Sequence, residues 1–183
     1  MTLEEIYYIS QIVAVVAILG SLLAIYFQMR QNHAFVRANE QREFLDQVRE
    51  WWALSAESEE KFQTICSGLQ DFHGLDRFQQ AQFHAWAADM QAIFTGAFFQ
   101  HRSTLISPSS HEGMARAFLS ILNTPGGHAW WEMSSKTANK DVVTYLNARL
   151  AAEAATLPVW TDLVPHFRLP PARTEATKPK DLA

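Results

Sequence analysis

The stretch IYYISQIVAVVAILGSLLAIYF, residues 6–27, decides the fold of this chain, because none of its 22 residues carries a formal charge. At about 1.5 Å of rise per residue, a helix of this length reaches about 33 Å, enough to cross the hydrocarbon core of a bilayer. Aromatic side chains near both ends suit the two membrane interfaces. These residues are Tyr7, Tyr8, Tyr26 and Phe27. The stretch therefore predicts a transmembrane helix.

Two alternatives to a spanning helix fit the sequence less well. A secretory signal peptide begins with basic residues and ends at a small-residue cleavage site, whereas this chain begins Met1-Thr2-Leu3-Glu4-Glu5 and its apolar run ends in large side chains. The core helix of a globular protein seldom stays uncharged on every side for about six turns. We therefore expect an uncleaved membrane anchor.

Basic residues flank the span on one side only. Arg30, Arg37 and Arg42 follow it within the distance over which Lys and Arg govern insertion, and no basic residue precedes it. The asymmetry predicts an N-terminus outside and the remaining chain in the cytoplasm. A reducing compartment suits a protein with one cysteine, Cys66, which we expect to be a small packed residue and not a reactive thiol.

The remaining length suits one small domain. We expect three parts: a transmembrane segment at residues 1–27, a cytoplasmic helical domain at residues 28–167, and a disordered tail at residues 168–183. The net charge of −4 and the absence of a long basic cluster argue against nucleic-acid binding, since phosphate neutralisation needs a basic face.

Apolar residues recur at helical spacing throughout, which predicts an all-α fold: a single transmembrane helix that continues into a stalk, followed by a small helical bundle. We expect helices at residues 28–54 (the stalk), from Glu59 after a Ser58 cap to about Phe72, at 77–104 after an Asp76 cap, after a Ser110 cap, at 125–131 after a Thr124 cap, and at about 140–156. Prolines then favour an extended flap in which Trp160, Leu163, Val164 and Phe167 pack.

Small and polar residues form a heptad-like seam along the span, alternating spacings of four and three. The seam consists of Ser10, Ala14, Ala17, Ser21, Ala24 and Gln28. Such seams let membrane helices approach closely, and their polar side chains can add interhelical hydrogen bonds of about 0.6 to 2 kcal/mol. Small residues are also common in spanning helices that stay alone. The seam predicts helix association, with a second copy or with another membrane protein.

Two further strings carry a family resemblance: Gln28-Met29-Arg30-Gln31-Asn32, and Thr124-Pro125-Gly126-Gly127-His128-Ala129-Trp130-Trp131-Glu132. Over residues 10–150 the chain resembles a broad group of uncharacterised bacterial proteins with one N-terminal membrane helix and a small helical cytoplasmic domain. It departs from that group at His128, where Arg is expected. The resemblance implies this fold and a place in the bacterial inner membrane, and it implies no activity.

The start of the helix at residues 125–131 allows two interpretations. Gly126 and Gly127 could bare the N–H groups of the first turn for an anion such as a phosphate or lipid headgroup, with His128 beside them. Alternatively, the glycines let this helix cross a neighbour closely, with Trp130 and Trp131 buried beside the crossing. Exposed, the two tryptophans would instead offer an aromatic contact surface.

The residues that support enzymatic or metal chemistry are sparse. No pair of histidines occurs at metal-binding helical spacing, and we find no nucleophile elbow, second cysteine or nucleotide-binding glycine loop. His101 and Asp89 fall near one helical face, where a structural histidine is the simpler interpretation. We therefore expect no catalytic residue, metal or cofactor.

The sequence thus favours a protein that works by binding. We expect an accessory or scaffold subunit of a membrane complex, or a homo-oligomer, whose contacts are the lipid bilayer and another membrane helix. A membrane-tethered binder of a small anionic ligand at residues 125–131 is the alternative.

Overall fold

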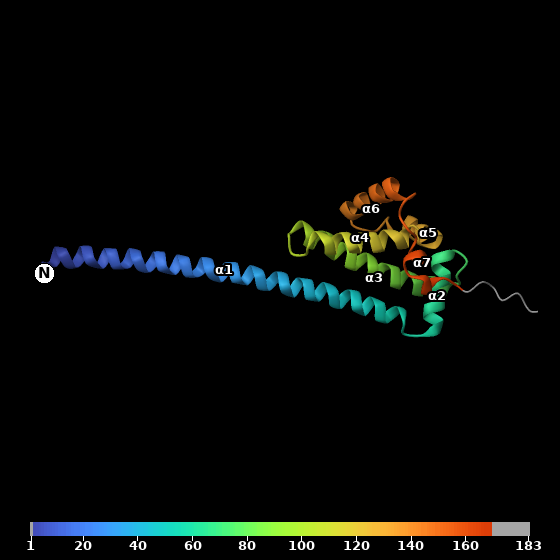
Figure 1. The fold of residues 1–183 in the computed structure, drawn as a ribbon, viewed down its shortest axis with the longest axis horizontal. Coiled ribbons are helices and arrows are strands. Elements are labelled where there is room, and N and C mark those ends of the chain that lie inside the picture. The colour runs from blue at the N-terminus through green and yellow to red at the C-terminus, as the bar shows by residue number, and fades with distance from the viewer. Residues whose placement is uncertain (1, 170–183) are drawn as a thin grey trace, which may run out of the picture. The chain divides into compact units, whose positions relative to one another are not determined.

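The computed structural model describes residues 2–169, without the side chain of Glu5, and the chain there is helical with no strand (Figure 1). The all-α prediction is confirmed. Residues 170–183, most of the predicted disordered tail, lie outside the described range.

Seven α-helices and one short 3₁₀-helix make up the described chain. They are α1 (Leu3–Ser55), α2 (Glu59–Gln70), α3 (Arg77–Arg102), α4 (Pro108–Leu122), α5 (Pro125–Ser134), α6 (Lys140–Glu153), α7 (Trp160–Leu163) and η1 (Pro165–Phe167).

Helix α1 runs from Leu3 to Ser55 without a break, so the predicted continuation of the apolar segment into residues 28–54 is confirmed. In the described chain it is the one helix long and apolar enough to cross a membrane, and none of its most apolar window is buried within the protein. Contacts divide the chain into two units, Met1–Glu43 and Phe44–Ala183. The last turns of α1 therefore belong to the second unit.

Local chemistry explains where several helices begin. Asp76 forms a capping box with Gln79: its carboxylate accepts from the N–H groups of Phe78 and Gln79, and the Gln79 side chain accepts from the Asp76 N–H. Ser58 caps α2 and Thr124 caps α5, as predicted.

Two local predictions are wrong. The cap of α4 is Ser107, whose hydroxyl accepts from the N–H of Ser110 at 3.1 Å, because Pro108 fits the first helical position, where its missing N–H needs no partner. The expected extended flap instead forms α7 and η1. Within it Trp160 and Phe167 are buried as expected, while Leu163 is 50% exposed.

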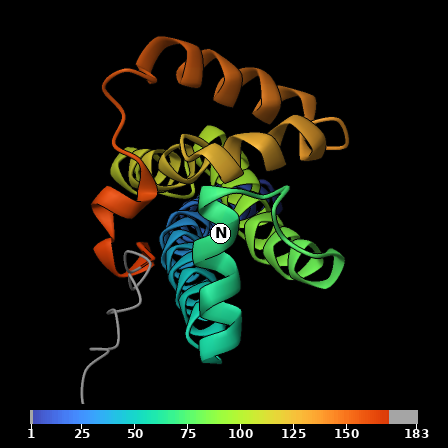
Figure 2. The ribbon, with the colours of Figure 1, turned by 90° about the vertical axis from the view of Figure 1, so that its right-hand side faces the viewer.

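Helix α3 lies at the centre of the second unit, in contact with α2 and α4. Its buried face consists of Phe83, Trp86, Met90, Ile93, Phe94 and Ala97, which are each no more than 8% exposed, together with Ala87. Helix α5 packs on α2 and α4, and α6 contacts α4 (Figure 2). One continuous apolar core results.

Tryptophans attach the last turns of α1 to this core. Trp51 stacks on Trp86 with ring centroids 5.0 Å apart, and its indole Nε1 donates to the backbone oxygen of Trp86 at 3.0 Å. The Trp86 Nε1 in turn donates to the hydroxyl of Ser55 at 2.8 Å. Both buried indole N–H groups are therefore satisfied, which lets two large rings lie in the core without a desolvation penalty.

Candidate functional site

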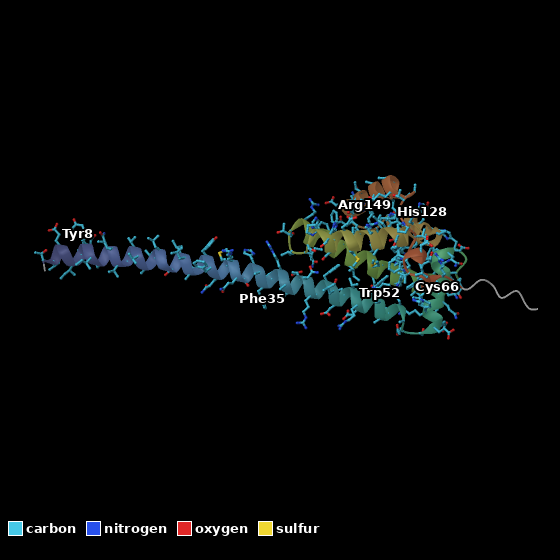
Figure 3. The ribbon with its side chains drawn as sticks, viewed as in Figure 1. Tyr8, Phe35, Trp52, Cys66, His128 and Arg149 are labelled. Atoms are coloured by element: carbon cyan, nitrogen blue, oxygen red, sulfur yellow. The ribbon has the colours of Figure 1, made fainter. Side chains whose placement is uncertain are left out.

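The seam residues all lie exposed along α1 within the first unit. Large apolar side chains on the same helix are exposed as well, and the side chains of Tyr8 and Phe35 project from the ribbon (Figure 3). An apolar segment that finds no cover within its own chain needs lipid or a partner helix around it. The helix-association role of the seam stays a prediction.

The seam serines already use their hydroxyl hydrogens within α1. Ser10 donates to the backbone oxygen of Tyr7 at 2.8 Å, and Ser21 donates to that of Ala17 at 2.9 Å. In this arrangement the hydroxyl oxygens can still accept a bond from a neighbouring helix, but a donated bond would require the local one to break. Small size, more than hydrogen-bond donation, is thus what the two serines offer to a neighbouring helix.

The glycines at the start of α5 have a clear packing role. A Cβ at Gly126 would lie 1.7 Å from the backbone oxygen of Gly68 in α2, and a Cβ at Gly127 would lie 2.0 Å from the backbone oxygen of Ile121. Any larger residue would force these segments apart. The geometry therefore supports the close-crossing interpretation.

The anion hypothesis for the same turn stays a prediction. The N–H of Gly127 already donates to the hydroxyl of Thr124 at 3.0 Å, and the exposed His128 ring lies 3.7 Å from the carboxylate of Glu132. A phosphate titration of the wild type and of His128→Ala would test the hypothesis. Gly127→Ala is less suitable, because its added Cβ would disturb packing.

Trp130 and Trp131 are buried, at 0% and 4% exposed, and each indole N–H has an internal acceptor. Trp130 donates to the Nδ1 of His84 at 3.0 Å, and Trp131 donates to the side-chain oxygen of Asn147 at 2.8 Å. The two rings thus tie α5 to α3 and to α6. In this conformation they are core residues, and an aromatic contact surface must be sought elsewhere.

His101 and His111 form a stacked pair. Their ring centroids are 4.5 Å apart with planes inclined by 14°, and His101 Nδ1 and His111 Nε2 are buried without a hydrogen-bond partner. The lone pairs of the two rings lie in separate, nearly parallel planes, an arrangement that does not bring them together on one ion. Asp89, the acid considered with His101, is exposed and lines a surface hollow between α1 and α3. Neither His101 nor His111 lines that hollow. Among the described residues no cluster of three or more potential ligands could hold a metal.

Arg149 joins α4 to α6 through a saturated hydrogen-bond network. Its guanidinium binds both carboxylate oxygens of Glu112 at 2.9 Å, the hydroxyl of Tyr145 at 2.9 Å, and the carboxylate of Glu153. These bonds employ all of the side chain's N–H donors. They raise the pKa of Arg149 and lower the pKa values of Glu112 and Glu153. With no donor left for a ligand, the network is a structural link.

Cys66 is buried at 1% exposed, as expected for a packed residue. Burial raises the pKa of its thiol to about 11, so the reactive thiolate is scarce near neutral pH.

The second unit contains an apolar groove that was not predicted from the sequence. It has a volume of about 290 Å³ and lies within the second unit, between the last turns of α1 and helices α3, α4 and α7. Trp51, Trp52 and Trp160 line it, so we name it the tryptophan groove. The adjacent tryptophans at residues 51 and 52 were the available signal, but only the fold brings Trp160 beside them.

A second hollow, of about 460 Å³, lies between α1 and α3. Glu50 and Asp89 give it two exposed carboxylates, and Gly96 forms part of its wall. It is more polar than the tryptophan groove and has no buried charged group, which makes it the weaker candidate for a binding site.

No protein-family model, curated protein or solved structure matches this chain.

Proposed function

We propose that this protein is a single-pass, membrane-anchored interaction protein without catalysis of its own. It acts as an accessory or scaffold subunit of a membrane complex, or as a homo-oligomer. The supporting observation is the 22-residue uncharged part of α1, whose apolar side chains are exposed, with no cover from residues 2–169. Lipid and a partner helix are the two surroundings that can supply that cover.

The proposed orientation places the N-terminus outside and the second unit in the cytoplasm of a bacterial cell. The support comes from Arg30, Arg37 and Arg42, which follow the span closely. Kinship with the uncharacterised bacterial family of small anchored helical proteins belongs to the same proposal. Protease accessibility of tags on the two ends, in inner-membrane vesicles, tests the orientation.

The proposed contact is the small-residue seam. Ala17 and Ser21 lie at its middle, and a partner helix could approach closely there because neither side chain extends far from the backbone. The large residues Val15 and Leu22 lie roughly 130° around the helix from the middle of the seam by the 3.6-residue period, and lipid would cover them.

A membrane two-hybrid assay with matched variants tests the seam. We expect the pair Ala17→Leu and Ser21→Leu to abolish association, because the larger side chains separate the helices. The control pair Val15→Leu and Leu22→Phe also adds bulk but should leave association unchanged. Equal signals from both pairs would refute the seam.

The identity of the partner requires a separate experiment. The full chain should be purified from gently solubilised membranes and its associated proteins identified by mass spectrometry. A stoichiometric second protein favours the accessory subunit, and cross-linked copies of this chain favour the homo-oligomer. A monomer with no associated protein and no cross-links between copies would count against the proposed function.

A further inference from the structure

The tryptophan groove is an unfilled apolar space within the second unit. Phe44 and Val48 of α1, Met90 of α3 and Met114 of α4 contribute to its walls, and no charged side chain lines it. A volume of about 290 Å³ equals the share of about ten water molecules in liquid water, so the groove can hold about ten methylene-sized groups. Its size and chemistry both suit a small, mostly apolar ligand.

One buried donor in the wall of the groove lacks an acceptor. Trp160, which lines the groove, is 4% exposed, and its indole Nε1 has no hydrogen-bond partner in the described chain. In contrast, the buried indoles of Trp51 and Trp86 in the same core each donate to an internal oxygen. The Nε1 atom exposes almost no surface, so an oxygen acceptor in the groove reaches it only after a small shift of the Trp160 ring. Because an unsatisfied buried N–H is costly, the bond formed in this way would stabilise the complex.

Apart from indole N–H groups, the polar side chains of the wall are the hydroxyls of two serines. Ser109 and Ser110, in the first turn of α4, line the groove, and both hydroxyls lie within hydrogen-bond distance of the Ser107 hydroxyl. A ligand must therefore be apolar over most of its length and carry a compact oxygen-containing head. Methionine walls suit a flexible chain, because their unbranched thioethers adapt to its shape.

We propose that the tryptophan groove binds a single fatty-acyl chain of about ten carbons through its apolar walls, with a carboxylate or ester oxygen accepting from Trp160 Nε1. The shared chemistry is the chain and its acceptor oxygen, which either a free fatty acid or a single-chain phospholipid can supply. This site is independent of the seam, since its lining residues all belong to the second unit.

Two glycines make a matched test possible. A Cβ at Gly113, in the wall of the tryptophan groove, or at Gly96, in the wall of the second hollow, would meet no atom within 4 Å. Gly113→Leu should therefore fill the tryptophan groove, while Gly96→Leu fills the other hollow. Gly113→Ala gives the helix a better former but leaves most of the groove open.

The experiment uses the full chain in nanodiscs of diether phosphatidylcholine and a ten-carbon fatty acid bearing a photoreactive diazirine. We expect labelling on the peptides that carry Met114 and Trp160, unchanged in Gly96→Leu and Gly113→Ala. In Gly113→Leu we expect at least about tenfold weaker labelling, which corresponds to about 1.4 kcal/mol. Circular dichroism confirms that each variant is folded.

Competition with unlabelled decanoate and with a ten-carbon lysophosphatidylcholine distinguishes the sources. Displacement by decanoate alone assigns a free fatty acid, and displacement by both assigns the chain as the recognised feature. Labelling that is equal in all folded variants, or that maps outside the groove, overturns the proposal. So does a cross-linked protein partner or second copy that Gly113→Leu removes while the fatty-acid labelling persists.

Discussion

The two units of this protein use apolar residues in opposite ways, and helix α1 contains both uses. In residues 6–27 large side chains such as Val16 and Leu19 are 62% and 55% exposed, whereas Phe44 and Trp51 are 6% and 2% exposed near the other end of the same helix. A helical pattern alone therefore does not say what will cover an apolar face. The absence of any charge around the helix is what distinguishes a lipid-facing segment from one that packs on a protein core.

The largest expected effect is a loss of membrane insertion caused by substitutions in the first unit. Val16→Arg with Leu19→Arg places two charges near the middle of the span, at a cost of about 5–7 kcal/mol for insertion. We expect the variant to leave the membrane pellet after carbonate extraction, while the wild type remains. The control pair Gln31→Arg and Asn39→Arg, beyond the span, should remain as well. If both variants stay in the pellet, the apolar segment is not a membrane anchor.

A substitution in the second unit should lower its stability without affecting membrane insertion. Gly126→Ala forces a Cβ to within 1.7 Å of the Gly68 backbone oxygen, where neither helix can yield cheaply. We expect a loss of about 3 kcal/mol or more in unfolding free energy, measured by denaturant titration in detergent, with membrane fractionation unchanged. Gly96→Ala, in open space, should be neutral or stabilise by up to about 1 kcal/mol. Equal stability of the two variants would contradict the close crossing.

The contrast between the units also explains what sequence could predict. The long apolar helix, the helical class and the caps Asp76 and Thr124 follow from short-range patterns, and the structure confirms each of them. That the apolar helix spans a membrane stays a prediction. The cap of α4 was misplaced because Ser107, Ser109 and Ser110 are equivalent as residue types. Only the proline between them determines which serine precedes the helix.

The candidate site was predicted less well, because it depends on contacts between distant segments. The tryptophan groove needs Trp52 and Trp160, which are more than a hundred residues apart in sequence and lie with ring centroids 5.6 Å apart. The same limit applies to Gly126, whose packing role needs Gly68. The seam, in contrast, is local to one helix and was therefore visible in the sequence.

A smaller effect is expected at the link between α4 and α6. Arg149→Met removes the bonds to Glu112, Glu153 and Tyr145 but keeps much of the side chain's volume, so we expect a loss of about 2 kcal/mol in unfolding free energy. Arg116→Met, at an exposed position on α4, should change it by no more than about 0.5 kcal/mol. Equal denaturation midpoints for the two variants would show that the network contributes nothing to stability.

The smallest expected effect is a pH dependence confined to the second unit. Burial, with smaller contributions from His101 and Arg149, lowers the pKa of His111 below its ordinary value of 6.5, although Glu112 opposes the shift. The unfolded chain therefore binds this proton more readily than the folded chain, and stability must fall as the pH falls through 6.5. The lowered pKa values of Glu112 and Glu153 act in the same direction, but only below their ordinary value of 4.5.

His111→Phe isolates this contribution. Phe keeps an aromatic ring among Phe94, Phe98 and Tyr145 but cannot take up a proton, and it removes the unpartnered Nε2. Between pH 7.5 and 5.5 we expect the wild type to lose thermal stability more steeply than this variant, and the exposed-site control His73→Phe to follow the wild type. Parallel pH profiles for all three proteins would refute the assignment to His111. Because residues 6–27 include no histidine or carboxylate, membrane association should not change over the same interval, which again separates the two units.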